Sequence, residues 1–104
     1  SYAITESKAE GTDSPTVLAA KIANELLDIS GVKASFVLTN YNDKIYISAR
    51  SIDEVNVQVM MEKLGGGGHI NMAGAQLKDC TVSEAEEKLR TMIDKMIEDG
   101  DITQ

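Results

Sequence analysis

The chain contains 104 residues with a formal net charge of −7, and its residues are 42% hydrophobic and 26% charged. This length and composition are typical of one small globular domain with a modest core. The longest apolar runs cover only a few residues, which excludes a membrane-spanning helix. The single cysteine, Cys80, excludes a disulfide within the chain and fits a reducing compartment.

The negative charge is concentrated near the C-terminus. From residue 79 to the end there are eight acidic and three basic residues, whereas residues 50–78 contain three of each. An extended nucleic acid requires a broad basic face, so we expect no such partner, while the neutral segment could receive a small anion. The chain begins with Ser1 rather than methionine, and we expect it to be part of a longer polypeptide.

The first part of the chain predicts a strand and then a helix. The strand covers residues 2–5, and a polar connector follows over residues 6–13. Ser14 and Pro15 suit the N-cap and the first position of a helix, which we expect to end with Gly31 as its C-terminal cap. The buried stripe of this helix consists of apolar residues at helical spacing: Leu18, Ala19, Ile22, Ala23, Leu26 and Leu27.

Two alternating segments, residues 32–39 and 45–50, flank the turn-forming residues 40–43. This pattern predicts an antiparallel hairpin. Because successive side chains in a strand point to opposite faces, Ser48 and Arg50 should lie on the face opposite the isoleucines.

Residues 53–64 allow two interpretations. Val55, Val57 and Val59 alternate as in a strand, whereas residues 57, 60, 61 and 64 follow helical spacing. We expect a helix over residues 55–64, because Gly65 can then cap its C-terminus.

The remainder predicts a strand that begins near Ala75, after a run of small residues that allows close backbone approach, and a final helix that ends at Gly100. Ser83 and Glu86 fit a capping box for that helix. The predicted fold is a single small α/β domain, with a mixed sheet of four to five strands and helices packed on it. The buried stripe of the final helix is expected at Ala85, Leu89, Met92, Ile93, Met96 and Ile97.

The run Gly65-Gly66-Gly67-Gly68, followed at once by the only histidine, His69, is the most unusual feature of the sequence. One glycine can be a helix cap and the others a flexible hinge. Alternatively, a ligand lies against bare main chain with amide groups turned toward it. The run matches neither a P-loop nor a dinucleotide-binding G-x-G-x-x-G motif.

Arg50 is the only arginine in the first 89 residues and stands at a predicted strand end beside Ser51. It is either a solvated charge or a phosphate ligand, since a guanidinium binds phosphate through two parallel hydrogen bonds. His69 is either a buried and satisfied side chain, a partner of a nucleobase, or a donor to phosphate.

One histidine and one cysteine cannot build a metal cluster unaided. A Cys80–His69 nucleophilic pair is conceivable, but nothing in the surrounding sequence supports it, and no general acid–base pair is evident. The residues therefore favour a domain that holds a substrate, with no catalytic or metal-ligating residue of its own.

The string from Met61 to Leu77, together with Arg50-Ser51 upstream, resembles the DHH-associated domain. This domain is the C-terminal half of DHH-family phosphoesterases and carries a Gly-Gly-Gly-His loop. The string is most similar to that of the membrane-tethered, GdpP-type cyclic-di-AMP phosphodiesterases of Gram-positive bacteria. Residues 13–38 agree with the same family, so the resemblance covers nearly the whole chain.

The resemblance implies that residues 1–104 are a substrate-binding domain and that a separate DHH domain holds two manganese ions. The Asp-His-His motif of that second domain is absent here, so we expect this chain alone to be inactive and to contain no cofactor. The complete enzyme would hydrolyse cyclic-di-AMP to the linear dinucleotide. The matched substrate-binding positions are Arg50, Ser51, Gly66, Gly67, Gly68 and His69.

The expected partners are a cyclic or short linear dinucleotide and the DHH domain of the same polypeptide, and a homodimer is left open. The resemblance also implies a cytoplasmic domain of a bacterial membrane protein. Two alternatives remain. One is a nucleic-acid-binding module of the nanoRNase, exonuclease or alanyl-tRNA synthetase type, and the other is a structural interaction domain whose glycines form a hinge.

Overall fold

The computed structural model describes residues 2–8, 15–29, 31–53 and 55–102. Within them the chain forms five strands and three helices, of which none is long and apolar enough to cross a membrane. The elements are β1 (Tyr2–Lys8), α1 (Pro15–Leu26), β2 (Ala34–Tyr41), β3 (Lys44–Ser51), α2 (Val57–Lys63), β4 (Gly67–His69), β5 (Met72–Lys78) and α3 (Val82–Glu98).

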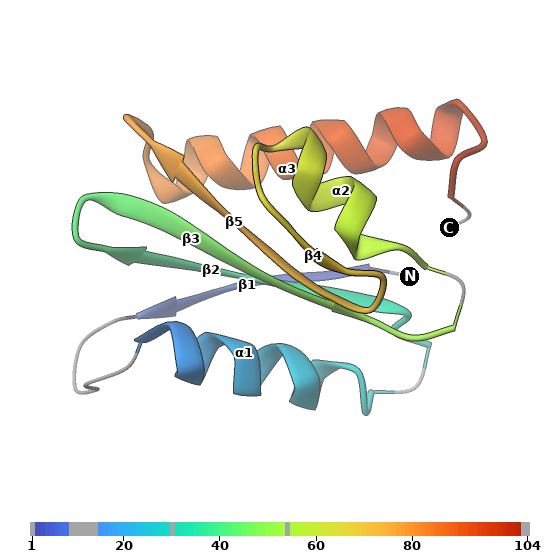
Figure 1. The fold of residues 1–104 in the computed structure, drawn as a ribbon, viewed down its shortest axis with the longest axis horizontal. Coiled ribbons are helices and arrows are strands. Elements are labelled where there is room, and N and C mark those ends of the chain that lie inside the picture. Colours follow the sequence, from blue (N-terminus) through green and yellow to red (C-terminus); the bar gives the residue numbers. More distant parts are fainter. Residues whose placement is uncertain (1, 9–14, 30, 54, 103–104) are drawn as a thin grey trace.

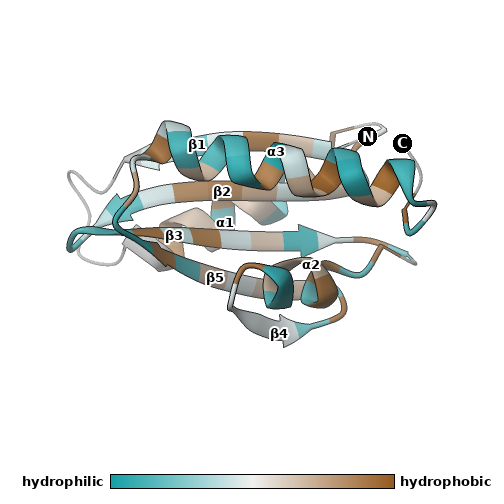
Figure 2. Ribbon diagram, turned by 90° about the horizontal axis from the view of Figure 1, so that it is seen from above, coloured by the Kyte–Doolittle hydropathy of each residue, from teal (hydrophilic) through white to brown (hydrophobic). Residues whose placement is uncertain are grey.

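The strands form one mixed sheet in the order β1-β2-β3-β5-β4, in which only β1 and β2 run parallel. Helices α2 and α3 lie on one face of the sheet, and α1 lies on the other (Figure 1). Seen from above, α3 lies along β1 and β2 while α2 lies over β5 and β4 (Figure 2). The predicted α/β fold with a mixed sheet is therefore confirmed, and the sheet has five strands.

The hairpin of β2 and β3 follows the predicted pattern. Its turn residues Asn42 and Asp43 both have positive φ, 53° and 61°, as a tight two-residue hairpin turn requires. Along β3 the buried and partly exposed side chains alternate, and Arg50 and Ser48 lie opposite the buried isoleucines. By contrast, the first six residues of β2 are all buried, because helices cover both faces of the sheet there.

The main core lies between the sheet and helices α2 and α3, and a small second cluster lies under α1. Among the described residues, the buried members of that second cluster are Ala19, Ala23 and Val37, with Ile22 and Leu26 packed against them. Of the stripe predicted for α1, Leu18 is exposed and Ile22 and Leu26 are only partly buried. The stripe of α3 is confirmed: Ala85, Leu89, Ile93 and Met96 are buried, with Met92 and Ile97 partly buried against them.

Several predicted boundaries are wrong. Strand β5 begins at Met72 and not near Ala75, because Met72 and Ala73 pair with both β3 and β4. Helix α2 begins at Val57 and not at residue 55, because Asn56 is its N-cap.

Strand β1 continues to Lys8 because it pairs with seven consecutive residues of β2, whereas a connector was expected from residue 6. Helix α1 ends at Leu26 and not near Gly31, because the following amides bond to carbonyls three residues back, in turns that tighten the chain. The N-cap predicted at Ser14 lies outside the described residues.

The capping box of α3 also differs from the prediction, which placed it at Ser83 and Glu86. Thr81 is the N-cap, its hydroxyl accepts from the Glu84 amide, and the Glu84 carboxylate accepts from the Thr81 amide at 2.9 Å. Both spacings fit the motif, but the earlier start lets Val82 pack against the core. Hydrogen bonds to the Glu84 carboxylate, first from the Thr81 amide and second from the Thr81 hydroxyl, lower the pKa of Glu84.

We predict that Thr81→Ala lowers the free energy of unfolding by about 1 kcal/mol, as expected for loss of an N-cap. The pKa of Glu84 is lowered in the folded state. Its ionised carboxylate therefore stabilises the fold at pH values above the pKa that Glu84 has in the unfolded chain, and this stabilisation is lost as the pH falls through the pKa that it has in the folded chain. Urea unfolding at pH 7 and pH 3 measures both effects. Glu84→Gln should cost more stability at pH 7 than at pH 3, and an equal cost at both would contradict the assignment.

Candidate functional site

The glycine run begins as the C-terminal cap of α2. Gly65 has φ +86°, and its amide donates to Glu62. The Gly66 amide donates to Met61 at 2.8 Å, and the two bonds together form a Schellman motif. This confirms both the predicted helix and the cap at Gly65, and it turns the chain back toward the sheet.

The rest of the run is not the loop that the sequence suggested but an edge strand. Gly67–His69 forms β4 and pairs antiparallel with Met72–Gly74 of β5. A Cβ at Gly66 would lie 2.1 Å from the Gly74 carbonyl oxygen, and one at Gly68 would lie 2.5 Å from Ala73 Cα. Nothing lies within 4 Å of the corresponding position on Gly67. The glycines therefore permit close packing against β5, whose small residues were predicted to allow such an approach, and they remain at the surface.

We predict that Gly66→Ala lowers the free energy of unfolding by about 1–3 kcal/mol, because the new methyl group meets backbone that must shift. The matched control is Gly67→Ala, where the added methyl group enters open space. Urea unfolding of the two variants checks the difference. Equal stabilities would show that the run tolerates side chains and that close packing is not its role.

Arg50 and His69 lie on the same face of the sheet. Arg50 pairs with Met72 of β5, and Met72 pairs with His69 of β4, so the three residues form one row. Directly paired residues point to the same face. The strands of Arg50 and His69 are separated by one strand, which places their backbones about 10 Å apart. Two groups that the sequence separates by 19 positions are thus brought together.

The Arg50 side chain is half-buried. Its Nη1 donates to the Ala49 carbonyl at 2.8 Å, and its Nε is buried without a hydrogen-bond partner in the described part of the chain. Burial lowers the pKa of Arg50, although a guanidinium stays charged at neutral pH. The imidazole of His69 is exposed. The guanidinium of Arg50 and the imidazole of His69 therefore both remain accessible to a ligand.

The next row on this face has almost no side chains. Ser48 pairs with Gly74, and Gly74 pairs with Gly67. Helix α1 packs on this side of the sheet mainly against β2 and β3, and less against β1. The result is an open floor of main chain beside Arg50 and His69, which we call the glycine floor (Ser48, Gly67 and Gly74).

Ser51 is placed differently from the other predicted site residues. Its side chain is buried, and its hydroxyl donates to the Val55 carbonyl at 2.6 Å and accepts from the Asn71 side-chain amide at 2.9 Å. The Ser51 amide donates to the Asn71 carbonyl, and the Val57 amide donates to Ile70. Ser51 therefore joins the end of β3 to the β4–β5 turn and to the start of α2.

Asn71 was not identified from the sequence as a residue of interest. Its amide also lies 3.4 Å from the carbonyls of Asp53 and Val55. The available signal was its position two residues after His69, in the pair Ile70-Asn71, where a two-residue turn must fall if residues on both sides are strands. We define Ser51 and Asn71 as the polar junction that fixes Arg50 relative to His69.

We predict that Asn71→Ala lowers the free energy of unfolding by about 1–2 kcal/mol, because it removes a donor to the hydroxyl of the buried Ser51. Asn24→Ala, at an exposed position of α1, serves as the control and should change stability little. Thermal unfolding of both variants measures the difference. If the Asn71 variant unfolds like the control, the polar junction does not stabilise the fold.

No three His, Cys, Asp or Glu side chains come together to hold a metal ion within the described ranges. Cys80 is partly buried after β5 and is not part of the Arg50–His69 row. The candidate site therefore consists of one arginine, one histidine and bare main chain on one face of the sheet.

The fold and this surface define a domain of the DHH-associated class. Residues 4–99 match the family model described as the DHHA1 domain. The chain belongs to this family.

Relatives with close sequence similarity include named phosphodiesterases. The chain is 56% identical over 80 residues to the cyclic-di-AMP phosphodiesterase PdeA of Listeria monocytogenes, which covers 76% of this chain and 12% of that protein. It is 48% identical over 85 residues to the cyclic-di-AMP phosphodiesterase GdpP of Bacillus subtilis, which covers 81% of this chain and 13% of that protein. The chain therefore spans about an eighth of the length of these relatives.

Solved structures share the fold at lower identity. An exopolyphosphatase-related protein from Bacteroides fragilis superposes with a TM-score of 0.76 at 24% identity, covering 91% of this chain and 29% of that one. The C-Ala domain of alanyl-tRNA synthetase from Aquifex aeolicus superposes with a TM-score of 0.58 at 21% identity, covering 88% and 86%. These similarities concern the fold alone.

Proposed function

We propose that residues 1–104 are the substrate-binding domain of a phosphodiesterase that hydrolyses cyclic-di-AMP to the linear dinucleotide. The observation that carries the proposal is the row Arg50–Met72–His69 beside the glycine floor, on a face that α1 covers mainly over β2 and β3. The names of the relatives at 48–56% identity support the choice of substrate.

In this proposal Arg50 binds a phosphodiester through the two parallel hydrogen bonds that a guanidinium provides. His69 donates to the same group or to the nucleotide next to it. Strand β4 is at the edge of the sheet, so one side of its backbone lacks a strand partner. Because successive amides of a strand point to opposite sides, one of the two neighbours Gly67 and Gly68 can offer its amide on that side. Together these groups orient the dinucleotide and offset its negative charge.

The hydrolytic step itself is assigned to a DHH domain outside residues 1–104. In this proposal that domain also binds the manganese ions of the enzyme. The same proposal places this domain in the cytoplasm, as part of a membrane-anchored parent. Ser51 belongs to the proposed site as a residue that positions Arg50, since its hydroxyl bonds to protein groups.

A nucleic-acid-binding role is the second candidate. An A-adding tRNA nucleotidyltransferase of Geobacter sulfurreducens is 30% identical over 79 residues, 75% of this chain. The net charge of −7 weighs against it, because affinity for long nucleic acids comes mainly from cationic contacts to phosphates.

We predict that a chimera, in which residues 1–104 replace the corresponding segment of Bacillus subtilis GdpP, hydrolyses cyclic-di-AMP in the presence of manganese. The isolated chain should show no hydrolysis. In the chimera, Arg50→Ala should reduce kcat/KM about 10- to 100-fold, the range expected for lost hydrogen bonds to a charged group. His69→Ala should also reduce it, and steady-state kinetics measures both.

The matched control is Arg90→Ala, which removes the only other arginine of the chain. Arg90 lies on α3, exposed and paired with Glu86 at 3.4 Å, and its loss should leave the kinetics unchanged. Unchanged kinetics for Arg50→Ala and His69→Ala would refute the proposed site and favour a structural domain. Tight binding of single-stranded RNA to the isolated chain, with a steep dependence on salt, would favour the nucleic-acid role.

A further inference from the structure

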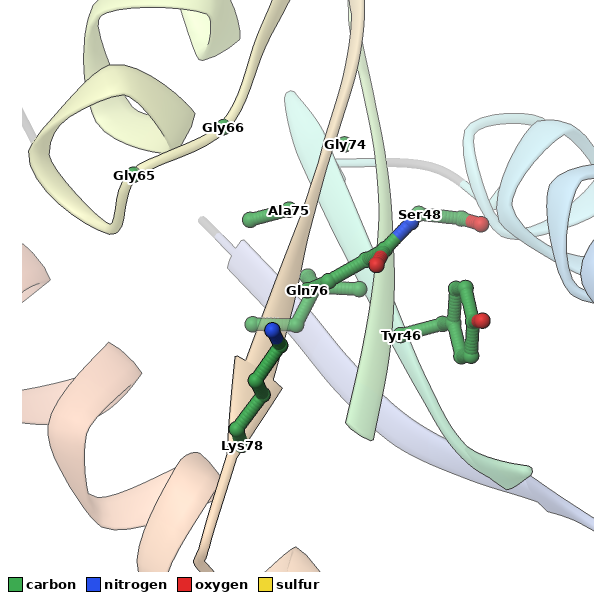
Figure 3. A pocket seen from close by; sticks show the side chains of 9 residues that line it. Tyr46, Ser48, Gly65, Gly66, Gly74, Ala75, Gln76 and Lys78 are labelled. Carbon is green, nitrogen blue, oxygen red and sulfur yellow. The ribbon is translucent and has the colours of Figure 1, made fainter. Parts of the chain in front are cut away.

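A hollow of about 440 Å³ adjoins the glycine floor, on the side away from Arg50. Its lining includes Tyr46, Ser48, Gly74, Gln76 and Lys78, with Gly65 and Gly66 above them. Tyr46 and Gln76 are direct cross-strand partners, one row beyond Ser48 and Gly74. In Figure 3 the Gln76 amide extends toward Ser48, with the Tyr46 ring nearby. The hollow therefore continues the face that carries Arg50 and His69.

We propose that this hollow is a nucleobase subsite, with the Tyr46 ring as the stacking surface and the Gln76 amide as the group that reads the base edge. The inference rests on the proposed function and adds the part of the substrate that this surface recognises. Its volume lies within the range of small-molecule sites, about 300–1,000 Å³.

The spacing of the rows supports a phosphate at one end and a base at the other. Successive rows on one face of a sheet are two residues apart, or about 7 Å, so Tyr46 lies about 13 Å along β3 from Arg50. The row between them is the glycine floor, where no large side chain obstructs a ligand. A molecule held by its phosphate at Arg50 can thus lie along the floor and place a planar ring against Tyr46.

The side chains at the far row fit the chemistry of a base. Tyr46 is partly buried and packs against Tyr41, with ring centroids 6.3 Å apart and an interplanar angle of 54°. This contact restricts the Tyr46 ring, and an aromatic ring held in place is a good partner for a base. Gln76 is exposed and carries both a donor and an acceptor, the combination that pairs with the edge of adenine.

Lys78 adds positive charge at the rim. It is paired in register with Lys44, and two like charges directly opposite each other are unfavourable in a sheet. A phosphodiester near the hollow would relieve that repulsion. Both ends of the face are therefore suited to an anionic ligand, while the middle is uncharged.

The first test maps binding on the unaltered chain. Titration of the isotope-labelled chain with cyclic-di-AMP, followed by amide NMR shifts, should perturb Tyr46, Ser48 and Gln76 together with Arg50 and His69. Helix α3 provides the internal reference and should not respond. Shifts confined to the surroundings of Arg50 and His69 would overturn the base subsite.

The second test uses the chimera with Bacillus subtilis GdpP. Tyr46→Leu keeps an apolar side chain but removes the ring, and should raise KM for cyclic-di-AMP about tenfold with little change in kcat, as expected for one lost stacking contact. Tyr46→Phe retains the ring and should keep KM near the unaltered value. Gln76→Ala should reduce the preference for cyclic-di-AMP over cyclic-di-GMP, whereas its control Gln58→Ala on α2 should not.

The outcomes separate this inference from the proposed function. If Arg50→Ala impairs turnover while Tyr46→Leu leaves KM unchanged, the base subsite is wrong and the proposed function stands. If neither variant changes turnover, the proposed function fails and the subsite fails with it. If Tyr46→Leu does not fold, the NMR map of the unaltered chain decides the question.

Discussion

The close contact between residues 66–69 and strand β5 determines the arrangement of the candidate site. Gly66 and Gly68 lie so near the backbone of β5 that a Cβ on either would meet main-chain atoms at 2.1–2.5 Å. This contact lets β4 join the sheet directly after the cap of α2, and it brings His69 into the row of Arg50. A bulkier residue at either glycine would separate the two strands and the two side chains together.

The polar junction holds the same region at its other end. Ser51 and Asn71 exchange hydrogen bonds between the end of β3 and the β4–β5 turn, and the Ile70 carbonyl accepts from the first amide of α2. Helix α2 is thus fixed at its N-terminus by the turn and at its C-terminus by the Schellman motif. Its residues Val57, Met60 and Met61 are buried, so packing against the core also holds this helix in place.

Sequence patterns predicted the elements with strong periodicity and missed what depends on contacts between distant segments. The alternation in β3 gave the correct face for Arg50, and the family resemblance gave the correct family. The short strand β4 was predicted as a loop, because glycine has no strand preference and its pairing depends on the alanines of β5. The burial of Ser51 and the part played by Asn71 depend on a turn 20 residues away in the chain. Local patterns do not encode that proximity.

The two-residue turn at Asn42 and Asp43 determines on which face of the sheet Arg50 lies. It sets the register of β3 against β2, and a shift of one residue in a strand turns every side chain to the opposite face. Insertion or deletion of a single residue in this turn would direct Arg50 into the apolar interior and Ala49 outward. The chain should therefore tolerate exchanges of side chains at this exposed tip much better than any change in its length.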